Sequence, residues 1–294
     1  MTLKTVAFIG VGNMGAPMAR NARRGGFDLI VCDRNQAMLD QFAKEGAKAT
    51  TNAADCAGAD AIVLLLGNDQ QVMDTLLGDQ GLVQAIPAGR HPIICMMGTT
   101  LPDTLKKLQG PIEVAGGRLI DAPVSGGIVG AEQGTLSIIM GGDAADAQAV
   151  QPLMEAMGKR IFHCGPLGAG EVVKVINNMI CVTNMFLTAE AIELAQKHGV
   201  SFESLTPILS VSTGLNFLTA DAATGRAQYA AWARSPEAYT AIYNVVHKDL
   251  HLALKLAELG QLDLGLLKGI AQYVDSNDPE DMGRWMRSGG VGER

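Results

Sequence analysis

Short apolar runs alternate with amphipathic stretches through the first half of the chain. The apolar runs cover residues 5–9, 29–32, 61–66, 93–97, 118–120 and 136–140, and stretches with helical spacing, such as 14–24 and 36–44, separate several of them. Apolar runs without polar alternation are typical of strands buried on both faces, which occur in parallel sheets covered by helices. Residues 1–165 are therefore expected to form an α/β domain with a parallel-rich sheet.

The pattern changes after Gly165. Residues 171–197 contain neither proline nor glycine, and Lys197-His198-Gly199 follows, where a cation in the last turn and a glycine favour the end of a helix. At 1.5 Å per residue this stretch predicts a helix of roughly 40 Å. Further helical patterns cover 202–210, 245–258 and 264–274. Residues 166–294 are expected to form an all-α domain, joined to the first through the long helix.

Composition narrows the class of protein. The chain of 294 residues has a net charge of −7 and is 48% hydrophobic, which suits a globular protein and gives no overall attraction to nucleic acid or to anionic membranes. We expect neither a leader nor a membrane span, and we expect a cytoplasmic location. The cysteines have no paired spacing that would indicate a zinc site or a disulfide framework: Cys32, Cys56, Cys95, Cys164 and Cys181.

A glycine motif follows the first apolar run directly and opens a helical pattern. Its sequence is Gly10-Val11-Gly12-Asn13-Met14-Gly15. The first glycine permits a tight turn, the second lets the backbone approach a pyrophosphate, and the third allows close packing of helix and strand. The motif predicts a dinucleotide-binding, Rossmann-like domain.

Asp33 ends the second apolar run, where a carboxylate can accept hydrogen bonds from both ribose hydroxyls of a dinucleotide. The same carboxylate would repel the 2′-phosphate of NADP. NAD is therefore the favoured cofactor, with NADP as the alternative because Arg34 can pair with a phosphate.

Two further groups of residues carry candidate chemistry. Lys174 and Asn178 lie four residues apart and therefore project from one face of the long helix. Ser125-Gly126-Gly127 follows a strand-like run, and its backbone N–H groups and hydroxyl can bind a carboxylate.

The segment His247-Lys248-Asp249-Leu250 is by default a solvated helix face. His247 and His251 have helical spacing, but no third ligand is evident nearby in the sequence, so no metal site is predicted.

Four ordered blocks of the sequence resemble the β-hydroxyacid dehydrogenase family, whose activities include those of 3-hydroxyisobutyrate dehydrogenase and tartronate semialdehyde reductase. The blocks are Phe8–Ala19, Asp121–Gly127, Gly168–Asn178 and Lys248–Leu250, so the resemblance covers nearly the whole chain.

The resemblance implies a Rossmann-like domain followed by a helical domain for substrate binding and assembly, in homodimers or homotetramers. It implies oxidation or reduction, by hydride transfer, between a small 3-hydroxy acid and its semialdehyde. Lys174 corresponds to the catalytic lysine, and the substrate-binding residues correspond to Ser125, Gly126, Gly127 and Asn178. The implied cofactor-binding residues are Gly10, Gly12, Asn13, Met14, Gly15, Asp33, Asn68, Thr99 and Lys248.

Two blocks depart from the family pattern. Gly67 replaces a common proline before Asn68, and Met96-Met97-Gly98-Thr99 stands where relatives often have Asp-Met-Ser-Thr. Residues 216–243 match no family pattern, so substrate-pocket residues are sought there. An imine reductase on the same scaffold and a dinucleotide-binding protein without catalysis remain as alternatives.

Overall fold

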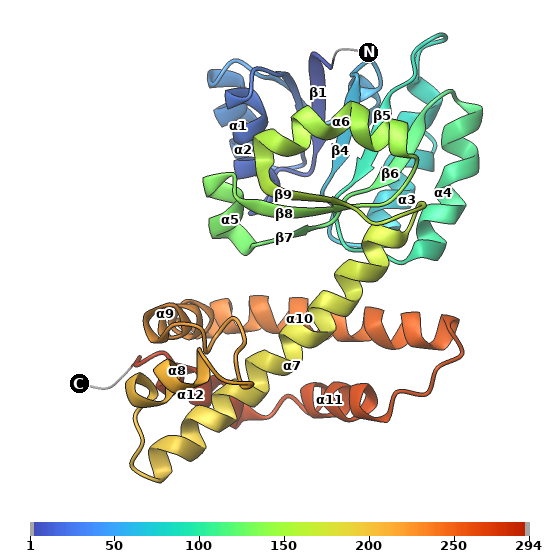
Figure 1. Ribbon diagram of the computed structural model, residues 1–294. Coiled ribbons are helices and arrows are strands. Elements are labelled where there is room, and N and C mark those ends of the chain that lie inside the picture. The colour runs from blue at the N-terminus through green and yellow to red at the C-terminus, as the bar shows by residue number, and fades with distance from the viewer. Residues whose placement is uncertain (1–2, 292–294) are drawn as a thin grey trace. The chain divides into compact units, whose positions relative to one another are not determined.

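The computed structural model describes residues 3–291 and divides the chain into two compact units. The division falls after Lys174, inside the long helix α7 (Ala169–Lys197). Figure 1 shows the strands and the shorter helices of the first unit and the helices of the second. The predicted domain boundary at residue 165 stays a prediction.

The first unit is built on a parallel sheet of six strands (Figure 1). Its order is β3 (Lys48–Thr50), β2 (Asp28–Cys32), β1 (Thr5–Ile9), β4 (Ala61–Leu64), β5 (Ile93–Met96) and β6 (Arg118–Asp121). The strand order reverses between β1 and β4, which is the place where open α/β sheets bind ligands. The predicted parallel-rich, Rossmann-like sheet is confirmed.

Side chains of β1 enter two separate cores, one on each face of the sheet. Val6 and Phe8 pack in one core with Met18 of α1, whereas Ala7 and Ile9 pack in the other. Both faces are therefore dry, which explains why the strands appear in the sequence as unbroken apolar runs. The helices of this unit are α1 (Gly15–Arg24), α2 (Gln36–Lys44), α3 (Asp69–Leu77), α4 (Pro102–Val114), α5 (Gly127–Gln133) and α6 (Ala144–Met157), with 3₁₀ turns η1 (Ala53–Cys56) and η2 (Leu82–Ala85).

A second, smaller sheet in the first unit was not expected. It consists of β7 (Val124–Ser125), β8 (Leu136–Met140) and β9 (Gly158–His163), with β7 antiparallel and β9 parallel to β8. The apolar run at 136–140 is thus a strand, as predicted, but it lies outside the main sheet. Most residues of β9 are exposed, so this strand has no apolar run in the sequence.

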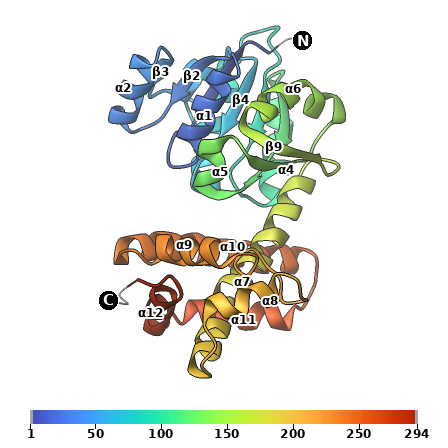
Figure 2. The same ribbon diagram turned by 60° about the vertical axis from the view of Figure 1, so that its left-hand side comes forward.

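The second unit contains helices and no strand among residues 175–291. After α7 follow α8 (Phe202–Leu209), α9 (Ala222–Trp232), α10 (Pro236–Leu259), α11 (Gly265–Asp275) and α12 (Pro279–Ser288), which Figure 2 shows from a second side. Trp285 is fully buried at the centre of the core, with rings of Phe186, Tyr229 and Tyr239 between 5.2 and 6.1 Å away. The predicted all-α second half is confirmed.

The length and composition of α7 would allow it to span a membrane. The sequence analysis expects no membrane span, and α7 is the helix of the described residues that meets the length and composition of one. This is weak evidence, because the core helix of a protein outside membranes meets the same criteria. Val182, Met185 and Phe186 of α7 are indeed buried in the core of the second unit.

Candidate active site

The predicted cofactor residues of the first unit gather at one edge of the parallel sheet. Gly10 follows β1, Asp33 follows β2, Asn68 lies after β4 and Thr99 after β5. The carboxyl ends of parallel strands share an edge, so the fold places these four positions on the same side of the sheet.

The glycine loop is held by its own backbone. A Cβ atom on Gly10, whose φ is +90°, would lie 2.3 Å from the Leu65 carbonyl oxygen, and one on Gly15 would lie 2.0 Å from the carbonyl oxygen of Gly10. A Cβ on Gly12 would meet no atom within 4 Å. Packing therefore requires glycine at 10 and 15, whereas Gly12 leaves the backbone accessible from outside.

The start of α1 suits an anion. No side chain caps this helix at Met14, so the N–H groups of its first turn have no side-chain acceptor there. Met14 is half-buried and Asn13 is exposed beside Gly12. In that turn Ala16 N–H bonds the Gly12 carbonyl and Pro17 has no N–H, so the helix dipole and the open backbone at Gly12 are the features that fit a pyrophosphate. The residues present therefore fit a bound dinucleotide.

Asp33 fixes the loop from the neighbouring strand. One of its carboxylate oxygens accepts from Val11 N–H at 2.7 Å, and the other accepts from Asn35 N–H at 2.8 Å. The side chain is half-buried, and each oxygen keeps a lone pair for a further donor. The arrangement can hold ribose hydroxyls, as the sequence analysis expects.

Asn68 and Thr99 stand beside a network that sequence reasoning missed. The Asn68 side chain accepts from Gln71 N–H at 2.9 Å and so caps α3. Thr99 is half-buried and precedes Thr100, whose hydroxyl donates to Asp69 at 2.5 Å and whose N–H donates to Glu171 at 3.1 Å. These bonds fix the loop after β5 without the aspartate and serine that relatives often have there.

Asp121 anchors the start of α7. Its two carboxylate oxygens accept from the N–H groups of Gly168 at 2.7 Å and Glu171 at 2.8 Å. Burial raises the pKa of this carboxyl group above its usual range, and the backbone N–H donors oppose that shift. The carboxylate thus takes the place of a helix cap for the element that carries Lys174.

Gly170 serves this anchor rather than a ligand. In the structure a Cβ at this position would lie 2.3 Å from the Ile139 carbonyl oxygen and 2.8 Å from the Asp121 carboxylate, so the space is already filled.

Ser125, Gly126 and Gly127 form the turn between β7 and α5. The two glycines have φ values of +133° and +63° and are exposed, and Ser125 is half-buried. A Cβ on Gly127 would meet no atom within 4 Å. The turn therefore presents accessible backbone, as a carboxylate-binding loop requires.

Lys174 and Asn178 occupy successive turns of α7, and both are half-buried. The amide nitrogen of Asn178 donates to Asp249 Oδ2 at 2.7 Å, and its oxygen accepts from the Asn177 amide at 3.1 Å. The second N–H of the Asn178 amide makes neither of these bonds, so it can serve as a donor to a substrate.

Asp249 on α10 is buried, whereas the sequence analysis expects it on a solvated helix face. It is 6% exposed and Leu250 is fully buried, so the expectation of a solvated face is wrong for these two positions. The Lys248 ammonium lies 2.9 Å from Asp249 Oδ1. Through Asp249, α10 fixes the orientation of Asn178 on α7.

Some residues of 216–243 pack in the core of the second unit, and others are exposed. Tyr229 is fully buried and donates to the Met185 carbonyl at 2.8 Å, and the Asn216 amide donates to Thr188 at 3.0 Å. The aromatic residues Trp232 and Tyr239 belong to the same core. The expectation that substrate-pocket residues lie in this segment stays a prediction.

Two family models match the chain. The NAD binding domain of 6-phosphogluconate dehydrogenase matches residues 5–165, and the NAD-binding domain of NADP-dependent 3-hydroxyisobutyrate dehydrogenase matches residues 168–287. Together they cover the Rossmann-like part and most of the helical part.

Characterised relatives agree with these models. An NAD-dependent L-serine dehydrogenase of Pseudomonas aeruginosa is 41% identical over 216 residues, which is 73% of this chain and 72% of the relative. A 2-(hydroxymethyl)glutarate dehydrogenase of Eubacterium barkeri is 31% identical over 95% of this chain and 91% of its own. A Mycobacterium tuberculosis 3-hydroxyisobutyrate dehydrogenase structure with L-serine has a TM-score of 0.79 and 26% identity, covering 98% of this chain and 99% of that one.

The chain therefore belongs to the β-hydroxyacid dehydrogenase family. It is an NAD(P)-dependent oxidoreductase of hydroxy acids.

Proposed function

We propose that the protein interconverts a small 3-hydroxy acid and its semialdehyde, with Lys174 as the acid and base. The relatives named above act on L-serine and 2-(hydroxymethyl)glutarate, and another acts on 3-hydroxyisobutyrate. In each of these acids the carbon that bears the carboxylate also bears a CH₂OH group, whose primary alcohol is the group to be oxidised. The acids differ only in the further substituent on the carbon that bears the carboxylate, so the carboxylate and the CH₂OH group define the substrate class.

The observation that carries the proposal is the pair of Lys174 and Asn178 on one side of a helix whose first turn is clamped by Asp121. The clamp fixes where the helix starts, and the bond from Asn178 to Asp249 fixes the amide. Oxidation of an alcohol or reduction of an aldehyde needs one group that transfers a proton to or from the oxygen and one donor that orients it, and these two residues can supply both from successive turns.

The remaining roles follow from the chemistry of each group. Ser125, Gly126 and Gly127 bind the substrate carboxylate through backbone N–H groups and the hydroxyl. Gly10, Gly12 and Gly15, with Asn13, Met14, Asp33, Asn68 and Thr99, bind the dinucleotide, and Lys248 binds near its nicotinamide end. When bound, the nicotinamide cofactor accepts or supplies the hydride.

Lys174 moves the proton that accompanies the hydride. In oxidation its neutral amine takes the proton of the substrate hydroxyl, and in reduction its ammonium returns a proton to the forming alkoxide. Lysine side chains are ordinarily charged at neutral pH, so reduction starts with the proton donor in place. Oxidation needs the neutral amine and should become faster toward alkaline pH.

The test is a panel of acids assayed with NAD⁺ and with NADP⁺. L-serine, 3-hydroxyisobutyrate, glycerate and 2-(hydroxymethyl)glutarate carry the shared primary alcohol, and lactate is the matched control with its hydroxyl on the neighbouring carbon. We expect turnover with at least one of the four and none with lactate. Because Asp33 repels a 2′-phosphate, kcat/KM should be higher with NAD⁺.

Reduction of cyclic imines without turnover of any hydroxy acid would instead favour the imine reductase alternative. The presence of Lys174 argues against that outcome. Assembly into homodimers or homotetramers and a cytoplasmic location stay predictions.

A further inference from the structure

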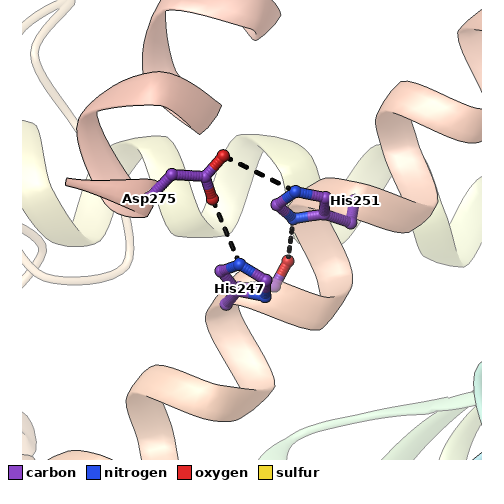
Figure 3. A group of neighbouring side chains, drawn as sticks. All are labelled: His247, His251 and Asp275. Carbon is purple, nitrogen blue, oxygen red and sulfur yellow. Dashed lines mark hydrogen bonds and ion pairs between the residues drawn. The ribbon is translucent and has the colours of Figure 1, made fainter. Parts of the chain in front are cut away.

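Two histidines on α10 form an exposed pair in the second unit. His247 and His251 lie one helical turn apart, and their rings stack with centroids 4.1 Å apart and an interplanar angle of 24° (Figure 3). Their side chains are 47% and 43% exposed. Nothing in the proposed reaction uses either imidazole.

The fold adds a carboxylate to this pair. Asp275, the last residue of α11, points toward both rings (Figure 3). Its Oδ1 lies 3.1 Å from His247 Nε2, and its Oδ2 lies 3.6 Å from His251 Nε2. The third ligand that the sequence lacked is thus supplied by the next helix of the chain.

We propose that His247, His251 and Asp275 bind a divalent transition-metal ion, with Zn²⁺ as the ion that fits best. One ligand atom from each residue lies within 4.8 Å of the other two. Zinc bonds of about 2.0–2.1 Å require ligand atoms roughly 3.3 Å apart in a tetrahedron. The separations of 3.1 and 3.6 Å, which run to the two different oxygens of Asp275, are close to that value, so small side-chain rotations would bring one oxygen and both Nε2 atoms around one ion.

The ligand set is selective for this kind of ion. Two imidazoles and one carboxylate are a common zinc set, and the exposed side leaves a fourth position for water. Mg²⁺ and Ca²⁺ prefer oxygen ligands, of which this cluster has too few.

The backbone prepares one imidazole for this role. His251 Nδ1 lies 2.9 Å from the carbonyl oxygen of His247, so the neutral ring donates its Nδ1–H to that oxygen. The Nε2 lone pair then faces Asp275 and the proposed ion. A second hydrogen bond that fixes the tautomer is a usual feature of histidines that bind metals.

Metal binding would join α10 to α11 near the surface. Without metal the same three side chains can form only exposed ion pairs, which stabilise a protein little. The ion would therefore act as a clamp between two helices rather than in hydride transfer, and it would raise the stability of the folded protein by mass action.

The test is calorimetric titration of untagged, EDTA-stripped protein with Zn²⁺. We expect one ion per chain with a Kd on the order of micromolar and a higher Tm in the presence of zinc. His247→Ala, His251→Ala and Asp275→Asn should each weaken binding by about tenfold or more. Titration with Mg²⁺ should give no comparable heat.

Matched controls separate this site from adventitious binding. His198→Ala removes an exposed histidine after α7, and Cys164→Ser removes an exposed thiol; both variants should bind zinc as the parent protein does. Cobalt(II) absorption gives a second readout that does not depend on stability: the visible bands should disappear in His247→Ala, and no sulfur-to-cobalt band should be present. Failure to bind one ion, or unchanged binding in the three ligand variants, would overturn the proposal.

Discussion

The glycine loop and the α7–α10 contact are two candidate functional regions that depend on opposite properties of the chain. The proposed role of the loop uses backbone groups, and the loop's shape is fixed by contacts of Gly10 and Gly15 with nearby backbone atoms. The proposed role of the second region uses the side chains of Lys174 and Asn178, and the hydrogen-bond partner of Asn178 lies 71 residues away on α10. The first depends on which side chains are absent, and the second on which are present.

The difference decides how each region should respond to substitution. Adding atoms to the loop should disturb both its fold and its ligand. Removing atoms from α7 or α10 should leave the fold in place and affect chemistry or substrate position alone.

The largest effect is expected at Lys174. Lys174→Ala should lower kcat by about 10²–10⁴-fold, because the general acid and base is lost, while NADH still binds. Steady-state kinetics and a fluorescence titration with NADH measure the two quantities. Lys197→Ala, at the far end of the same helix, is the control and should keep kcat. A Lys174→Ala variant with near-normal kcat would mean that the lysine is structural.

Two glycine substitutions should separate folding from binding in the loop. Gly15→Ala places a Cβ against the Gly10 carbonyl, so it should lower both Tm and the affinity for NAD. Gly12→Ala has room for its Cβ and should keep Tm, yet weaken NAD by about tenfold, or 1.4 kcal/mol, because the methyl group occupies space needed by the pyrophosphate. Thermal melts and NAD titrations measure both. Equal effects of the two variants on Tm would contradict this account.

Asp249 should act through Asn178. Asp249→Ala removes the acceptor that orients the amide, and we expect KM for the hydroxy acid to rise by about tenfold while the affinity for NAD stays unchanged. Asn178→Ala should give a similar KM, and the double variant should be no worse than either single variant, since both remove one interaction. Fully additive effects would show that the two residues act independently.

The last effect concerns stability rather than activity. Asp121→Asn keeps the size of the side chain but offers one acceptor to two backbone N–H groups, at a cost of about 1–3 kcal/mol at neutral pH. The raised pKa of Asp121 means that the folded state binds its proton more tightly than the unfolded chain, so this group adds stability as the pH falls through the raised value. The gap between parent and variant in urea melts should therefore widen on acidification. A gap that narrows would contradict the sign.

The sequence predicts the bounds of those strands and helices whose apolar residues form a clear run or a clear helical spacing. The strands at 5–9 and 136–140 and the helix at 36–44 have the expected bounds. β9 was missed because most of its residues are exposed and it has no apolar run. The start of α10 at Pro236 was placed nine residues too late, although Ser235 caps it and proline is favoured in the first turn.

The site divides in the same way. The glycine loop and Asp33 could be predicted because their residue types and spacing are a recognisable motif after the first two strands. Asp69, Asp121 and Asp249 were missed in their actual roles, because each bonds to groups distant in the sequence. A carboxylate next to buried positions, such as Asp121 at the end of β6, is the one signal that could have identified an anchor, since buried charge requires partners.

The anchoring of α7 by Asp121 has a consequence for the placement of Lys174. Gly168 and Glu171 are tied to the end of β6, and the boundary between the two units falls only after residue 174. Lys174 follows this anchor by one turn and lies in the same unit as the glycine loop. The proposed proton donor is thus tied, through the first turns of its own helix, to the end of a strand of the parallel sheet.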